Sequence, residues 1–341
     1  MNEKLKKIAN KNYLLSKIFG YARYYHCKQK KFDTYLKLLD YTNDKKLLKD
    51  AFFSEYRYSI LPIEYFLYGF QNLNDRGRKE FIGNGDRKVL LDGTGDPEAK
   101  KLIDDKYQLY KKFKKDYKRE MIVVNNEEYD DFIKFVNKHQ KIIAKPYDAM
   151  QGSGIRMIET CDDLSQTFKE MFKKSKSFVL EELIVPEKEL SEFHPESINT
   201  IRFATYYNSK SDIVYNAFAF IRFGIGEMTV DNLAAGGISA IIDVETGIIE
   251  TSAMNMKLES YLVHPDSKKQ IVGYQIPKWD QLKKLAQELS KQIKNYNYIS
   301  WDFALTENGW VIVEANSNGG LYTVQMHGQG IRKKMESYIN N

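Results

Sequence analysis

The order in which helical and strand-like patterns follow one another constrains the fold of this chain more than any other feature. Up to about residue 80, apolar residues recur at helical spacing, as in Leu47, Leu48, Ala51 and Phe52. Beyond Pro97 the two patterns alternate: helices are predicted over 97–115, 127–138 and 161–173, and strands over 121–124, 141–146, 154–159 and 177–182. This alternation predicts an α+β fold with helices packed on one face of the sheets, and it argues against a doubly wound fold.

Strands dominate after residue 197. They are predicted over 198–207, 212–224, 238–243 and 248–253. A helix over 279–295, a hairpin over 299–315 and a helix near 329–339 follow them. We therefore predict three regions: helices over 1–82, a mixed part over 83–182 and a strand-rich part over 183–341.

Composition excludes several classes of protein. The 341 residues are 43% hydrophobic and 29% charged, which is too apolar for a disordered chain and too charged for a membrane bundle. No window approaches about 18 uncharged apolar residues, and the N-terminus lacks the apolar region of a signal peptide. Cys27 and Cys161 are too far apart in the sequence for a CxxC metal site, and two cysteines exclude a disulfide scaffold. We expect a soluble, cytoplasmic protein.

Positive charge is concentrated at the N-terminus. The first fifty residues hold thirteen Lys and Arg against five Asp and Glu, a balance of +8, whereas the whole chain carries +6 and the remainder therefore −2. Such a segment suits an anionic lipid surface, nucleic acid or a phosphorylated substrate. A solvated helix face is the alternative. Because no recognised nucleic-acid motif accompanies the charge, we expect no nucleic-acid partner, and peripheral contact with the inner face of the membrane stays open.

The hairpin over 299–316 brings candidate metal ligands together. A three-residue loop over 307–309, with Gly309 in the left-handed position, places Asp302 directly opposite Glu314. Asn316 falls on the same face, two residues further along. Two opposed carboxylates repel each other, so the arrangement is favourable if a hard cation such as Mg²⁺ lies between them. The alternative is an exposed polar face whose carboxylates pair with lysines.

A second candidate site lies at the end of the apolar strand that finishes in Lys145 and Pro146. The flexible loop that follows contains Gln151, Gly152, Ser153 and Gly154. Small residues let backbone N–H groups approach phosphate oxygens, and a lysine on a strand supplies a fixed positive charge. The order differs from a Walker A loop, whose lysine follows the glycines. A plain turn is the alternative for the glycines alone.

Three further segments carry polar residues next to apolar strands. The strand over 178–184 contains Glu181 and Glu182, whose neighbourhood could offer hydrogen-bonding groups to adenine and ribose. Arg202 on the next strand could clamp a phosphate or a carboxylate with two parallel hydrogen bonds. Asn232 precedes the pair Gly236 and Gly237, which permits close approach of a substrate. Each of these features taken alone is as well explained by structure as by function.

Taken together and in this order, the motifs resemble the ATP-grasp superfamily. The phrases His-Pro-Glu-Ser-Ile-Asn-Thr-Ile-Arg over 194–202 and Val-Asp-Asn-Leu-Ala-Ala-Gly-Gly-Ile over 230–238 are similar to the narrower family of sugar-transfer-associated ATP-grasp proteins. The resemblance covers about residues 85–330. It implies two α+β lobes with ATP between them, preceded here by the N-terminal helical region.

The resemblance also implies roles for individual residues. Phosphate contacts would come from Lys106, Lys145 and the loop of Gln151, Gly152, Ser153 and Gly154. Glu181, Glu182 and, more loosely, Glu189 would lie near adenine and ribose, and Asn232 would also belong to the cofactor-binding residues. Arg202 would act with Lys145 on the transferred phosphoryl group, and Mg²⁺ would be held by Asp302, Glu314 and Asn316.

The implied activity is an ATP-dependent carboxylate-amine ligase that forms an acyl phosphate. Its family setting suggests an amino acid or other amine joined to a sugar carboxylate such as a hexuronate, in surface polysaccharide synthesis and beside other glycan enzymes. Two alternatives stay open: a kinase that phosphorylates a sugar hydroxyl, and a nucleotide-binding partner of glycan enzymes without activity.

Overall fold

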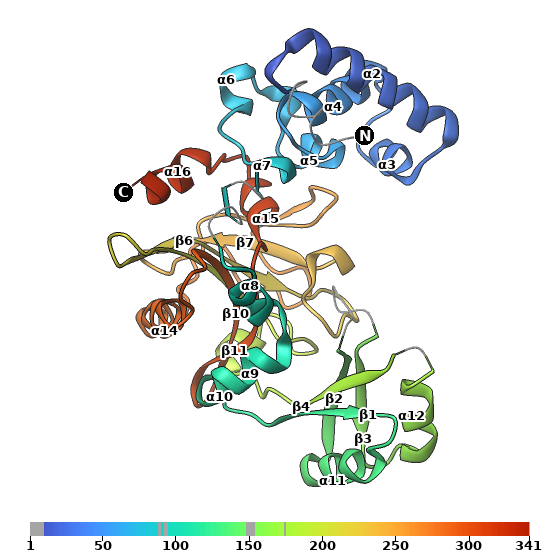
Figure 1. The fold of residues 1–341 in the computed structure, drawn as a ribbon, viewed down its shortest axis with the longest axis vertical. Helices are drawn as coiled ribbons and strands as arrows, with labels where there is room; N and C mark the ends of the chain where they lie inside the picture. The colour runs from blue at the N-terminus through green and yellow to red at the C-terminus, as the bar shows by residue number, and fades with distance from the viewer. Residues whose placement is uncertain (1–9, 88–89, 92–94, 148–153, 174, 341) are drawn as a thin grey trace.

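The chain folds into a helical region and two sheets, which lie one after another along the long axis of the molecule (Figure 1). The computed structural model describes residues 10–87, 90–91, 95–147, 154–173 and 175–340. The helical region is blue in Figure 1, the four-stranded sheet is green, and a seven-stranded sheet lies between them. Within the described ranges, no helix is both long and apolar enough to cross a bilayer.

The N-terminal region is built from short helices around an aromatic core. Its elements are α2 (Tyr13–Lys30), α3 (Asp33–Leu36), η1 (Lys37–Asp40), α4 (Lys45–Arg57), α5 (Pro62–Leu67), η2 (Phe70–Asn72), α6 (Asp75–Arg78) and α7 (Asn84–Arg87). The Asn12 side chain caps α2 by accepting from the N–H of Leu15 at 3.1 Å. Gly20 lets α2 approach α4 closely, because a Cβ there would lie 2.6 Å from Phe53 Cα.

Three helices connect this region to the first sheet: α8 (Pro97–Asp104), α9 (Lys106–Lys112) and α10 (Lys114–Tyr117). The prediction of one continuous helix over 97–115 is therefore wrong. Asp105 ends the first helix and begins the second, since its carboxylate accepts from the N–H groups of Tyr107 and Gln108 at 3.1 and 3.0 Å.

The four-stranded sheet has the order β1-β4-β2-β3. Its strands are β1 (Met121–Asn125), β2 (Lys141–Pro146), β3 (Arg156–Glu159) and β4 (Ser177–Glu182). Helices α11 (Tyr129–His139) and α12 (Leu164–Met171) cover one face, where Phe132 and Phe168 pack against Ile142 and Phe178. The other face carries Lys145 and Glu181, because side chains alternate along a strand.

The seven-stranded sheet has the order β11-β10-β5-β6-β7-β8-β9. Its strands are β5 (Ile201–Asn208), β6 (Ile213–Phe223), β7 (Ile238–Ile242), β8 (Ala253–Met254), β9 (Ser260–Tyr261), β10 (Tyr298–Thr306) and β11 (Gly309–Asn316). The connecting segments contain α13 (Lys188–Ser191), η4 (Leu233–Ala235) and α14 (Trp279–Lys291), and α15 (Leu321–Gln325) and α16 (Arg332–Asn340) follow β11. Every strand pairing between described residues is antiparallel, which confirms the α+β prediction.

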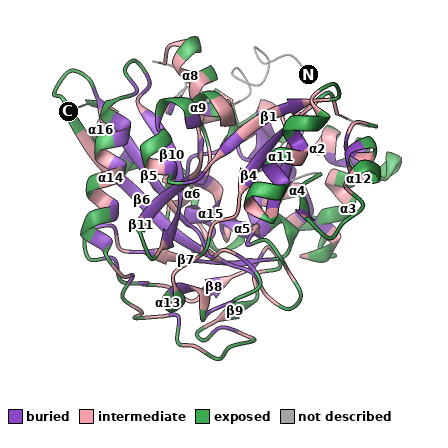
Figure 2. Cartoon of the chain, turned by 90° about the horizontal axis from the view of Figure 1, so that it is seen from below, coloured by how far each residue is buried: buried purple, intermediate pink, exposed green. Residues whose placement is uncertain are grey.

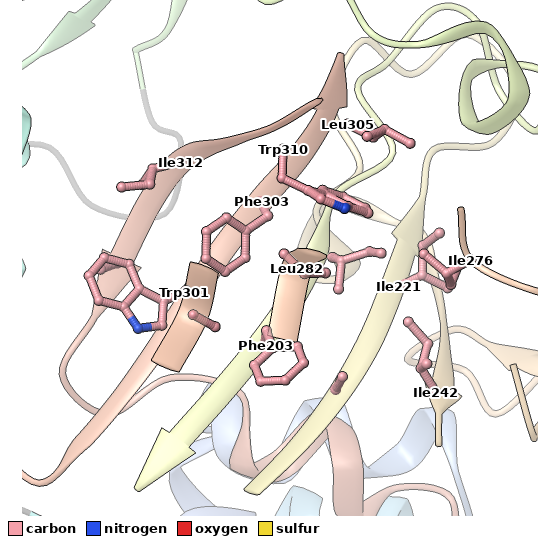
Figure 3. Close-up of a cluster of buried hydrophobic side chains, with 14 of the residues drawn as sticks. Phe203, Ile221, Ile242, Ile276, Leu282, Trp301, Phe303, Leu305, Trp310 and Ile312 are labelled. Carbon is pink, nitrogen blue, oxygen red and sulfur yellow. The ribbon is translucent and has the colours of Figure 1, made fainter. Parts of the chain in front are cut away.

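The two faces of this larger sheet pack against different helices. On one face Phe203, Trp301 and Phe303 pack with Leu282 of α14 (Figure 3). On the other face the aromatic strand residues pack with Leu321 of α15. Burial is highest in the central strands, such as β5 and β10, and falls off on the outer sides of the helices (Figure 2). The prediction that helices cover one face therefore holds for the smaller sheet and is wrong for the larger one.

Candidate active site

Asp302 and Glu314 lie opposite each other on β10 and β11, as the hairpin pattern predicts. The route to this pairing differs from the prediction. Thr306 pairs with Gly309, so two residues form the turn instead of three, and a bulge at Val313 shifts the register by one residue. Gly309 has a φ of +91°, in the region that favours glycine.

Two arginines from the neighbouring strands bind Asp302. Arg202 on β5 donates from Nε and Nη2 to the two carboxylate oxygens, each at 2.5 Å. Arg222 on β6 donates from Nη2 to Asp302 Oδ2 at 3.0 Å. The Asp302 side chain is fully buried. Guanidinium groups of the protein itself therefore offset the repulsion between the opposed carboxylates, whereas the sequence predicts a metal ion or, as the alternative, lysines in that role.

Glu314 is held less tightly than Asp302. Its Oε1 lies 3.6 Å from Arg202 Nη2, and 41% of its side chain is exposed. Asn316 on the same strand donates from Nδ2 to Glu314 Oε1 at 3.4 Å. Thus the three predicted ligands do gather on one sheet face. Among the described residues, no group of three or more His, Cys, Asp and Glu side chains is arranged to hold a metal ion. The predicted trio is not such a group, because it consists of two carboxylates and one amide.

The two carboxylates respond oppositely to this environment. Burial pushes the pKa of Asp302 upward, but the charges of Arg202 and Arg222 outweigh it and hold the pKa below its ordinary value. The pKa of Glu314 is raised, first because the surrounding protein displaces water and second because Asp302 is negatively charged. The positive charge of Lys145, on the smaller sheet, acts on Glu314 in the opposite direction. Charges on the two sheets therefore influence each other.

Arg222 belongs to a polar cluster that the sequence reasoning did not assign. Its Nε and Nη2 donate to Thr200 Oγ1 at 3.1 and 2.7 Å. Asp231 accepts from the Thr200 N–H at 2.9 Å and lies 3.5 Å from Arg222 Nε. A charged residue at the end of the apolar run Phe218–Phe223 was the available signal, since an arginine in a buried strand needs partners.

A second charged cluster lies on the smaller sheet. Lys145 Nζ contacts Glu181 Oε1 at 2.8 Å, and Arg119 Nη2 contacts Glu181 Oε2 at 3.1 Å. Burial would raise the pKa of Glu181, but these two cations lower it. Arg119, which the sequence reasoning also missed, donates to the carbonyl of Ile312 on β11 at 2.6 Å. This bond ties the cluster to the strand that carries Glu314.

The segment after β11 covers Arg202. A Cβ on Gly319 would lie 3.2 Å from Arg202 Nη1, and one on Gly320, whose φ is +88°, would lie 3.1 Å from Arg202 Cδ. Tyr298 donates from its hydroxyl to the Gly319 carbonyl at 2.5 Å. The two glycines therefore allow the backbone to pass directly over the guanidinium group.

The structure does not bring all the predicted residues to this face. Glu182 points to the face opposite Glu181, where it accepts from the Glu120 N–H at 2.9 Å and lies 3.8 Å from His139. The Asn232 side chain caps η4 by accepting from the Ala234 N–H at 2.9 Å. Glu189 lies in α13, and its carbonyl accepts from Lys269.

The remaining predicted residues belong to the phosphate-binding prediction. Lys106 begins α9, directly after the capping residue Asp105. Gly154 has a φ of +76°, and a Cβ there would lie 2.9 Å from Pro146 Cγ. Gln151, Gly152 and Ser153 lie outside the described residues.

A family model described as sugar-transfer associated ATP-grasp matches residues 94–340. Because the match covers most of the sequence, this chain belongs to that family. The match confirms the resemblance drawn from the motifs and, with it, the ATP-grasp fold preceded by a helical region. No curated protein matches the chain in sequence.

Solved structures of ATP-grasp ligases are similar in fold. D-alanyl-alanine synthetase A from Vibrio cholerae is 12% identical with a TM-score of 0.45, over 72% of this chain and 63% of that one. D-alanine–D-alanine ligase from Bacillus anthracis, complexed with ATP, is 12% identical with a TM-score of 0.41, over 71% of each chain. The ATP-grasp ligase PsnB, complexed with minimal precursor, Mg and ADP, is 12% identical with a TM-score of 0.42, over 72% and 60%.

Proposed function

We propose that this protein is an ATP-dependent ligase that joins a carboxylate to an amine through an acyl phosphate. Family membership supports ATP as the phosphoryl donor. The observation that carries the proposal is the pairing of Asp302 and Glu314 on one sheet face, with Arg202 and Arg222 beside them and Lys145 acting from the other sheet. Phosphoryl transfer needs such an array, because charge must be balanced around the transferred group.

The residues on this face fit a magnesium ion. Asp302 Oδ1 accepts one hydrogen bond from Arg202 and keeps a second lone pair, whereas Oδ2 accepts two bonds. Glu314 is partly exposed, and its pKa is raised first by burial and second by the charge of Asp302, so a cation beside it would favour its charged form. Asn316 would add an amide oxygen. Mg²⁺ commonly takes one or two carboxylates and completes its shell with water and phosphate oxygens. When bound, it would draw electron density from the phosphate oxygens.

The cations of the site have distinct roles in this proposal. Lys145, Lys106 and the loop over 151–154 would contact the phosphates of ATP. Arg202 and Arg222 would stabilise the charge that develops on the phosphoryl group. Glu181 is already engaged by Lys145 and Arg119, so we assign it to positioning Lys145, which replaces the predicted contact with adenine.

The reaction proceeds in two steps that need no covalent bond to the protein. A carboxylate oxygen of the first substrate attacks the γ-phosphorus of ATP, and the bond from that phosphorus to the bridging oxygen breaks, which releases ADP. The nitrogen of the amine then attacks the acyl carbon, the bond to the phosphate oxygen breaks, and the nitrogen loses a proton. The products are ADP, phosphate and an amide. Positioning and charge stabilisation provide the catalysis.

The family description supports the proposed substrate class. An association with sugar transfer points to a sugar carboxylate, and a hexuronate is the simplest sugar that carries one. The amine would be an amino acid or another small amine, and the product would belong to a surface polysaccharide. This assignment is an analogy at the level of the family.

The experiment is a substrate panel with product identification. Purified protein is incubated with Mg-ATP, uronic acids and amino acids, and the products are identified by mass spectrometry. The proposal requires an amide that forms only when both partners are present, together with ADP and phosphate. A phosphorylated sugar formed without any amine would show a kinase and contradict the ligase assignment. Glu314→Gln should remove turnover, whereas Glu336→Gln on α16, a glutamate that pairs with Arg332 of the same helix, should leave it unchanged.

A further inference from the structure

Helix α2 carries large apolar side chains that are exposed to solvent. Leu14, Ile18 and Tyr25 are 64%, 53% and 54% exposed. Their spacing of four and seven residues places them along one side of the helix. The opposite side, with Ser16 and Gly20, packs against α4. We call Leu14, Ile18 and Tyr25 the outer stripe. A surface helix normally shows polar residues on that side, so the outer stripe is an exception to the usual pattern.

Positive charge surrounds the outer stripe. Lys17 and Lys28 are exposed on α2, and Lys49 of α4 places its Nζ 5.0 Å from the centre of the Tyr25 ring. No Asp or Glu occurs between Lys4 and Phe32. Phe32, directly after the helix, is a further exposed apolar side chain. Single exposed apolar residues are common, but a line of them on one helix side, flanked by lysines and free of acidic residues, is typical of helices that lie in a membrane interface.

We propose that the outer stripe of α2 docks onto an anionic lipid bilayer. Leu14, Ile18 and Tyr25 would enter the boundary between headgroups and acyl chains, while Lys17, Lys28 and Lys49 meet the negative headgroups. The complementarity between these lysines and the anionic headgroups favours a bilayer as the partner of the outer stripe. A second copy of the chain would bring the same lysines face to face and be repelled. The inference does not depend on the ATP chemistry, and its test leaves that chemistry untouched.

The test is sedimentation of the full chain with lipid vesicles. Vesicles of phosphatidylcholine alone are compared with vesicles containing phosphatidylglycerol, at low and high salt. We expect binding to the anionic vesicles only, weakened by salt. The double variant Leu14→Ser with Ile18→Ser should bind at least about tenfold more weakly. Lys17→Gln with Lys28→Gln should weaken binding by about fivefold for each lysine.

The chain offers a matched control for the apolar substitutions. Leu262 is 64% exposed, as Leu14 is, and Val185 is 71% exposed, and both lie outside the helical region. Leu262→Ser with Val185→Ser should bind vesicles as the unaltered chain does. The proposal would be overturned if the unaltered chain bound neutral and anionic vesicles equally, or did not bind anionic vesicles. It would also be overturned if the control variant lost as much binding as the Leu14 and Ile18 variant. A dimer in light scattering that the Leu14 and Ile18 substitutions convert to a monomer would overturn it as well, because a second copy would then cover the stripe.

Discussion

The Asp302→Asn substitution separates structural from catalytic effects at the candidate active site. Asp302 is fully buried and accepts three hydrogen bonds from the guanidinium groups of Arg202 and Arg222. Asparagine has nearly the same shape, but it is neutral and turns an N–H group toward one of the arginines. Removing one partner of a buried ion pair typically costs about 3–5 kcal/mol, because the other charge stays buried without compensation. We expect a loss of that size in the free energy of unfolding.

Glu314→Gln is the matched control. Its carboxylate faces Arg202 at 3.6 Å and its side chain is 41% exposed, so its replacement should change the free energy of unfolding by less than about 1 kcal/mol. Both variants should lose Mg²⁺-dependent ATP turnover, but Glu314→Gln should do so with its fold intact.

Urea unfolding followed by tryptophan fluorescence measures the difference in stability between these variants. Trp279, Trp301 and Trp310, the three tryptophans of the chain, all lie in the core of the larger sheet. If the free energy of unfolding of Asp302→Asn lay within about 1 kcal/mol of that of the unaltered chain, the reasoning would be refuted, because the arginines would then not depend on that carboxylate. A larger loss for Glu314→Gln than for Asp302→Asn would refute it equally.

Three further predictions concern Glu314, His327 and Gly20. The pKa of Glu314 is raised in the fold, so the unaltered chain should lose stability relative to Glu314→Gln as pH rises through and above the ordinary glutamate range, in denaturant titrations without Mg²⁺. Burial lowers the pKa of His327 to about 4, so stability should fall as pH drops from about 6.5 toward that value, and thermal melts of His327→Gln should show a smaller fall. Gly20→Val should lower the free energy of unfolding by about 1–3 kcal/mol, because its Cβ would meet the Phe53 backbone, and an unchanged melting temperature would contradict this.

Local pattern was sufficient to predict much of the fold. Alternation along the strands placed Asp302, Glu314 and Asn316 on one face, and that placement survived an error in the turn, because the bulge at Val313 restored the register. The same alternation places Glu181 and Glu182 on opposite faces, so the two residues do not act as one motif.

The arginine partners of the site could not be predicted from local pattern. Arg222 is 80 residues from Asp302, and Arg119 is 62 residues from Glu181 and 193 from Ile312. The order of strands within each sheet and the contact between the two sheets bring these residues together. For the same reason the sequence could not show that guanidinium groups already balance the opposed carboxylates. The sequence also does not indicate which side of α2 is exposed, because apolar residues occur on both sides of that helix.

Transfer of labelled oxygen tests the central claim of carboxylate activation most directly. A uronic acid labelled with ¹⁸O in its carboxylate is incubated with Mg-ATP, the amine identified by the substrate panel and the protein, and the released phosphate is examined by ³¹P NMR. An acyl phosphate requires that one carboxylate oxygen leaves with the phosphate, so the account predicts one ¹⁸O atom in each phosphate. Phosphate without label, released at the same rate as ADP, would contradict carboxylate activation.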